Sequence, residues 1–277
     1  MLPTNIRHPA VAGQFYPSQP DLLQLDLDRC LAPEAAEQSE FSRAIGCVVP
    51  HAGYMYSGHV AGAVYRRLPA RTSYIILGPN HFGRGAPLAE METGSWLTPL
   101  GEVPLNPALG EAVRRACPAL VEDAKAHARE HSLEVQLPFL QRCSPAFTLL
   151  PIAIGVSDYG TLEALGHAVS EAVKGSDSPI LIVASSDFNH YEPDSVTRVK
   201  DRKAIDRILD LDPEGLYETV FRERISMCGL GPTVAMLVAA NDLGAKGAEL
   251  IKYATSADAG GPVDSVVGYG GIVITAD

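Results

Sequence analysis

The chain has no long hydrophobic run and little positive charge, and both absences narrow what it can do. No apolar stretch among its 277 residues approaches the ~20 residues that a helix needs to span a bilayer. It holds 22 Lys and Arg against 33 Asp and Glu, a net charge of -11. Because nucleic-acid-binding proteins usually carry a basic face, we do not expect a nucleic acid as a partner. Because a spanning segment is missing, we do not expect a membrane either.

Cysteine is scarce, and the spacing of the cysteines argues against a disulfide framework. The five cysteines include no C-x-x-C pair, so the pattern indicates reduced thiols and not a disulfide framework. Residues 1–20 are polar and proline-rich and lack the apolar core of a signal peptide. We therefore expect a cytoplasmic protein.

Three short apolar runs each end at a polar loop that carries a histidine. The runs span residues 45–49, 74–77 and 180–184, and the loops hold His51, His81 and His190. Short β-branched runs predict buried strands, and in open α/β sheets ligands bind beyond the carboxyl ends of the strands. Because imidazole is the commonest metal ligand and acid/base group near neutral pH, the pattern predicts a metal or acid/base site on a sheet.

Apolar runs and helical patterns alternate along the chain, which predicts an α/β fold. We expect a single domain over residues 1–277, with a mainly parallel or mixed central sheet and helices on both faces. Further strands are predicted at 147–154, 250–253 and 266–275, the last with local departures from parallel order. Helices are predicted at 21–31, 58–68, 106–116, 133–142, 161–174, 195–209, 213–222 and 232–243, the third capped by Asn106 and the fourth by Ser132.

Each loop residue has a functional and a structural interpretation. Gly53 lets the backbone near His51 approach a ligand closely, but His51 could equally be a turn histidine at a strand end. Asp187 can orient the imidazole of His190 by accepting its second N–H, as carboxylates do around metals. The alternative is a polar loop in which Asp187 bonds to local backbone. The repetition of the context favours the functional interpretation.

Cys228 lies just before the predicted helix that begins at Pro232. The positive potential at a helix N-terminus lowers the pKa of a nearby thiol and favours the thiolate, which is a metal ligand or a nucleophile. The alternative is a buried free cysteine.

Residues 127–131 match H-x-x-E-H, a zinc-peptidase pattern. We discount the match, because Ser132 looks like a helix start and places His131 outside a continuous helix. Glu130 and His131 can still face the site from a loop. A thiol or serine hydrolase that uses Cys228 or Ser186 is a minor alternative, since no G-x-S-x-G motif is present.

Five short motifs together resemble those of the MEMO family, whose bacterial and archaeal members are often named AmmeMemoRadiSam system protein B. The motifs are Pro-His-Ala-Gly-Tyr (50–54), Gly-Pro-Asn-His (78–81), Glu-His-Ser-Leu-Glu (130–134), Ser-Ser-Asp-Phe-Asn-His (185–190) and Met-Cys-Gly (227–229). They occur in order over essentially the whole chain.

The resemblance implies a fold like that of the class III extradiol ring-cleavage dioxygenases. It implies that His51, His81 and Cys228 are the metal-site positions and that Asp187 and His190 line the same pocket. Those dioxygenases hold iron(II) with two histidines and a carboxylate, whereas this chain offers Cys228. Because a thiolate is softer and can be oxidised, ring cleavage does not carry over, and the reaction must be argued from the site.

Two hypotheses follow from these residues. The first is a redox enzyme with one transition-metal ion, iron or copper with zinc as the alternative, and a small-molecule substrate. Its catalytic residues would be His190, Asp187 and His131. The residues that contact its substrate would be Tyr54, Asn80, Glu130 and Ser186. The second is a non-catalytic protein that binds a metal, a peptide or a partner, with a radical SAM protein as the partner that the family name implies.

Overall fold

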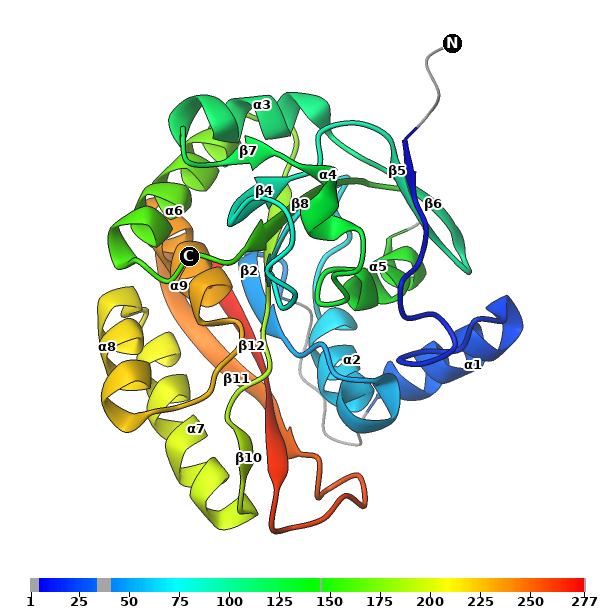
Figure 1. Ribbon diagram of the computed structural model, residues 1–277, viewed down its shortest axis with the longest axis vertical. Coiled ribbons are helices and arrows are strands. Elements are labelled where there is room, and N and C mark those ends of the chain that lie inside the picture. The colour runs from blue at the N-terminus through cyan, green and yellow to red at the C-terminus, as the bar shows by residue number, and fades with distance from the viewer. Residues whose placement is uncertain (1–4, 34–40, 145, 277) are drawn as a thin grey trace.

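The computed structural model of the chain describes residues 5–33, 41–144 and 146–276, and a mixed β-sheet forms its centre (Figure 1). In spatial order its strands are β10 (His190–Glu192), β12 (Val266–Ala276), β2 (Ala44–Val49), β9 (Ile180–Ser185), β3 (Ser73–Pro79), β8 (Thr148–Ile154), β4 (Leu88–Glu90) and β7 (Val121–Glu122), with β11 (Ala245–Thr255) paired to β12. The central strands β2, β9, β3 and β8 are parallel, whereas β12 and β4 flank them antiparallel. The expected single-domain α/β fold with a mixed sheet is confirmed.

Side chains of the central strands alternate between two hydrophobic cores, as the period of two in a strand requires. Val48 and Ile75 face one core, and their neighbours Val49 and Ile76 face the other. All four are fully buried. Burial on both faces explains why these strands read as continuous apolar runs in the sequence.

Helices cover both faces of the sheet (Figure 1). The first core is closed by α3 (Pro107–Ala116), α6 (Tyr159–Lys174), α7 (Asp194–Leu209), α8 (Pro213–Glu223) and α9 (Leu230–Asp242), and the second by α1 (Pro20–Cys30), α2 (His59–Tyr65) and α5 (Leu137–Cys143). The side chain of Asn106 caps α3 as predicted, accepting from the backbone N–H of Leu109 at 3.1 Å. No helix in the described ranges is long and apolar enough to cross a membrane.

Two helix predictions are wrong in detail. The helix expected at 133–142 is split into a 3₁₀ turn (Glu134–Gln136) and α5, because Pro138 lies in the first turn of α5 and cannot sit inside a longer helix. Ser132 does not cap it, because neither segment begins with a side-chain cap bond, and the Ser132 hydroxyl donates to the carbonyl of Pro79 at 3.2 Å. The helix expected at 58–68 ends at Tyr65 and follows a π-helical turn (Tyr54–Gly58).

A small second sheet was not predicted. It consists of β1 (Ile6–Arg7), β5 (Ser95–Thr98) and β6 (Gly101–Pro104). Its strands are too short to show a periodic pattern. Arg7 nevertheless links this sheet to the segment before α5 through a buried ion pair with Glu134.

Candidate metal centre

Parallel strand ends bring the predicted site residues to one edge of the sheet. His51 follows β2 and His81 follows β3, while Asp187 follows β9, which lies between them. Cys228 reaches the same edge from the loop between α8 and α9. The ligand atoms of His51, His81 and Cys228 all lie within 4.8 Å of one another. That spacing suits three ligands of one metal ion.

His51 is buried and its proton position is fixed. Its Nδ1 lies 2.9 Å from the hydroxyl of Ser185, which donates its own proton to the carbonyl of Ser132 at 2.6 Å. Ser185 therefore accepts from Nδ1–H, and Nε2 keeps its lone pair, 3.2 Å from the Sγ of Cys228. Burial, together with repulsion from the nearby His81, holds the pKa of His51 well below its usual value. A neutral imidazole is the form that binds metals.

Glu130 fixes which ring nitrogen of His81 carries the proton, as Ser185 does for His51. Its Oε1 accepts from Nδ1 of His81 at 2.9 Å, and its Oε2 accepts from the backbone N–H of His81 at 2.7 Å. Burial opposes ionisation of Glu130, but the bonds from His81 and from the backbone of Ser132 lower its pKa to about 2. His81 thus presents Nε2 to the cluster. Glu130 is fully buried and positions His81, while its role as a substrate contact stays a prediction.

Gly229 lets the Cys228 loop lie against the end of β9. A Cβ at position 229 would lie 2.3 Å from the Cβ of Ser186 and 2.5 Å from the carbonyl oxygen of Ser185. Only glycine fits such a close approach. The backbone N–H of Asp187 then donates to the Sγ of Cys228 at 3.3 Å.

The pKa of Cys228 differs from the expectation. Although α9 begins nearby, burial of the thiol and the charge of Asp187 raise its pKa well above the usual value. Desolvation therefore outweighs the potential of the helix N-terminus. A thiolate here needs a positive partner, which a metal ion supplies. The donor set thus fits a bound cation.

His190, the predicted acid/base, is held by Ser226 and not by Asp187. Its Nδ1 donates to the carbonyl of Ser226 at 2.9 Å, and its backbone N–H donates to the Ser226 hydroxyl at 2.8 Å. A carbonyl can only accept, so His190 also keeps its lone pair on Nε2. Asp187 instead accepts the backbone N–H of His51 at 2.8 Å, and burial raises its pKa to about 6.

His131 lies beside the cluster. Its ring stacks on His81 with centroids 4.8 Å apart, and it lies 5.6 Å from the ring of His51. Burial lowers its pKa. His81, Glu130 and His131 form a second group with metal-ligand spacing, but both oxygens of Glu130 are already bonded to His81.

The other predicted contact residues lie at different depths. Tyr54 is buried and donates to the carbonyl of Val135 at 2.7 Å. Ser186 is buried and its hydroxyl bonds to the carbonyl of Asp187 at 2.8 Å. Asn80 lines a cavity beside the cluster.

The H-x-x-E-H match does not form a helical peptidase site. His127 is the last residue of α4 (Ala124–His127) and is fully buried, while Glu130 and His131 lie in the loop that follows. As expected, those two residues face the cluster from a loop.

Sequence reasoning missed two supporting residues, Ser226 and Gln136. The side-chain amide of Gln136 donates to the hydroxyl of Ser185 at 2.9 Å and to the carbonyl of Pro50 at 3.0 Å. Gln136 thereby braces the residue that holds His51. Its only signal in the sequence is a polar residue within an apolar segment, and Ser226 is marked only by its nearness to Cys228.

Comparison with known proteins finds relatives along nearly the whole chain. A family model described as Memo-like protein matches residues 7–273. A MEMO1 family protein of Methanosarcina barkeri is 43% identical over 270 residues, covering 97% of this chain and 100% of the relative. One from Methanopyrus kandleri is 43% identical over 277 residues (96% and 98%), and one from Methanocaldococcus jannaschii is 40% identical over 284 residues (97% and 99%).

Proposed function

The chain belongs to the Memo family, and on that premise we propose that it is a metal-dependent redox protein that binds one iron or copper ion through His51, His81 and Cys228. The observation that carries the proposal is that the imidazoles of His51 and His81 are held in the same tautomer. Both have Nδ1–H engaged by an acceptor, so both Nε2 atoms are available beside one sulfur. Metal-binding histidines are typically oriented in this way.

The donor set decides which ions suit the site. Two imidazoles and a thiolate favour copper, iron or zinc over hard ions such as magnesium. We favour iron or copper and keep zinc as the alternative. When bound, the ion would supply Lewis-acid and one-electron chemistry. All five cysteines are free, which fits the reducing cytoplasm in which we place the protein.

His190 is the proposed acid/base. Ser226 holds its Nδ1–H, which leaves Nε2 to accept or return a substrate proton. A positioned acid/base typically contributes ~10²–10⁴ in rate. His131, beside the cluster, is a candidate helper, and Asp187 contributes by bracing the His51 loop.

A non-catalytic role in binding a peptide or a partner protein is the second candidate. Each of the three histidine loops continues into an exposed apolar side chain: Met55, Phe82 and Tyr191 are 73%, 53% and 78% exposed. These side chains would be available to a peptide or a partner protein that approaches the histidine loops. The partner implied by the family resemblance is a radical SAM protein.

Oxygen uptake distinguishes the two candidates. Iron- or copper-loaded wild type and His190→Gln would be compared with catechol and hydroquinone as probes. Uptake by the wild type that His190→Gln loses at equal metal content supports the enzyme. A metal-dependent rise in melting temperature without uptake by either protein supports the binding role.

A further inference from the structure

A cavity of about 340 Å³ opens beside the candidate metal centre, between the carboxyl ends of β3 and β8 and the start of α9. His81 and Cys228 form part of its wall, so the cavity is continuous with the cluster. The rest of the wall is mainly apolar and includes Pro79, Ile154, Val156, Leu162, Met227 and Leu230. Its volume lies in the usual range for small-molecule sites.

The chemistry of the wall restricts the ligand. None of the described residues that line the cavity is Asp, Glu, Lys or Arg, so a charged group would lose its hydration without a counter-charge. Asn80 lines the cavity, and its Oδ1 is buried without a hydrogen-bond partner among the described residues, while its Nδ2 donates to the carbonyl of Arg84 at 2.8 Å. Because protein atoms cover that oxygen, the cavity presents a mainly apolar wall to a ligand.

We propose that this cavity binds the uncharged apolar end of the substrate, an aromatic ring or a branched alkyl group. The inference rests on the proposed function, because it places the polar, metal-seeking end of the same molecule at His81 and Cys228. Gly231 lets the start of α9 lie close against the wall, since a Cβ there would lie 3.1 Å from both Ile154 and Leu162.

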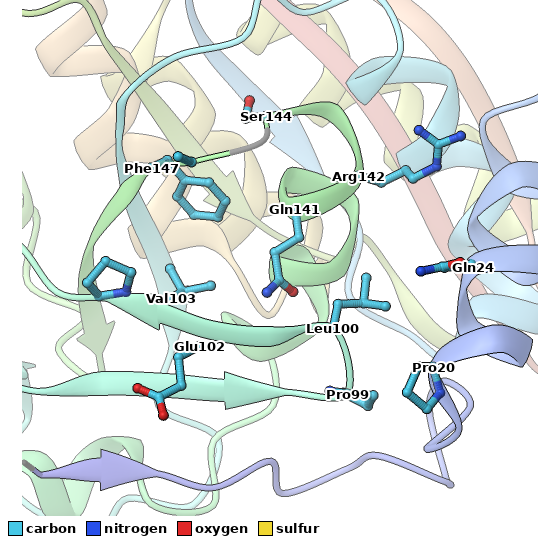
Figure 2. Close-up of a pocket in the computed structure, with 12 residues that line it drawn as sticks. Pro20, Gln24, Pro99, Leu100, Glu102, Val103, Gln141, Arg142, Ser144 and Phe147 are labelled. Carbon is cyan, nitrogen blue, oxygen red and sulfur yellow. The ribbon is translucent and has the colours of Figure 1, made fainter.

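A larger cavity elsewhere does not compete for this role. It measures about 520 Å³ and is lined by residues such as Leu100, Glu102 and Phe147 (Figure 2). Phe147 precedes β8, whereas Ile154 at the other end of β8 lines the cavity beside the metal cluster. A strand of this length separates the two by ~20 Å. The carboxylate of Glu102 is moreover bonded to Ser95 at 2.8 Å.

The test uses two hydroxamates that share a metal-binding head and differ in the tail. Acetohydroxamate and benzohydroxamate would be titrated into zinc-loaded wild type, Val156→Phe and Val199→Phe. Val156→Phe fills the cavity. Val199→Phe makes the same change at an exposed position on α7, 59% exposed. We expect benzohydroxamate to bind the wild type and Val199→Phe about tenfold or more tightly than acetohydroxamate, since its ring is buried. In Val156→Phe the ratio should fall below about threefold.

A second measurement does not depend on the metal. Methyl-labelled, metal-free wild type would be titrated with benzyl alcohol, and the NMR signals of Ile154, Val156 and Leu162 should shift. If the two hydroxamates bind the wild type equally, or if Val156→Phe keeps the wild-type ratio, the cavity inference is wrong and the metal centre stands. If no metal binds, shifts with benzyl alcohol support the cavity while the proposed function fails. Absence of shifts then overturns both.

Discussion

The Nε2 of His51 lies 3.2 Å from the Sγ of Cys228, although 177 residues separate them in the chain. No local preference brings the two together. The parallel strand end places His51, and the close approach at Gly229 places the Cys228 loop against it. Several predictions test whether this arrangement serves a metal ion.

Replacing Glu130 with Gln should weaken metal binding by ~10–100-fold, the usual cost of losing a partner that orients a metal-binding histidine. The amide nitrogen cannot accept, so one of the two bonds from His81 is lost. Metal titration measures the effect. Glu102→Gln is the control, because its carboxylate bonds to Ser95 in the small sheet. Equal affinities in the two variants would contradict the positioning role.

Gly229→Ala should displace the Cys228 loop, because the new Cβ would lie 2.3 Å from the Cβ of Ser186. We expect a loss of about 1–3 kcal/mol in the free energy of unfolding, together with weaker metal binding. Gly160→Ala is the matched control, since its Cβ would meet its nearest neighbour at 3.6 Å, an ordinary contact. Urea unfolding and metal titration of both variants check the prediction. Wild-type behaviour of Gly229→Ala would refute it.

Ser226→Ala should lower kcat by about fivefold and leave metal content unchanged. The change removes the hydroxyl that accepts from the backbone N–H of His190 and donates to Asn189, and a net bond of this kind is worth ~1 kcal/mol. Ser226→Thr, which keeps the hydroxyl, should restore the rate. Steady-state kinetics with metal analysis would show this, and a loss of metal in Ser226→Ala would argue for a general structural defect.

Asp201 should make stability fall as the pH rises from about 4 to about 6. Its side chain is fully buried, accepts from Tyr253 and from the backbone of Asn189, and burial raises its pKa to about 6. The native state therefore holds a proton that the unfolded chain releases near pH ~4. The free energy of unfolding should drop by on the order of 3 kcal/mol over this range and level off above it.

Asp201→Asn removes the titrating group. Urea unfolding of both proteins between pH 4 and pH 7 gives the difference in free energy, in which the other titrating groups cancel. The free energy of unfolding of the wild type, relative to that of Asp201→Asn, should fall as the pH rises from about 4 to about 6. A constant difference would show that Asp201 titrates normally.

Local sequence patterns predict the central part of the fold. The runs that became β2, β3 and β9 are buried on both faces, and burial on both faces leaves a continuous apolar pattern. Asn106 and Pro107 mark the start of α3 for equally local reasons. The two-residue strand β1 has no such pattern, because it forms only by pairing with β5.

The candidate site was predicted less completely. His51 and His81 follow predicted strands, so strand order alone brings them to one edge. The partners that set their tautomers come from distant segments: Ser185 lies 134 residues from His51, and Glu130 lies 49 residues from His81. The pKa of Cys228 was misjudged because the helix N-terminus is visible in the sequence, whereas the burial of the thiol is not.

Metal content tests the central claim most directly. Wild type, His51→Ala, Cys228→Ser and the control His167→Ala would be purified anaerobically, reconstituted and measured by mass spectrometry. His167 is an exposed histidine that bonds to Asp242 at 2.7 Å. We predict close to one equivalent of iron or copper in the wild type and the control, and little in the other two variants. No bound metal in the wild type, or metal retained by both variants, would contradict the account.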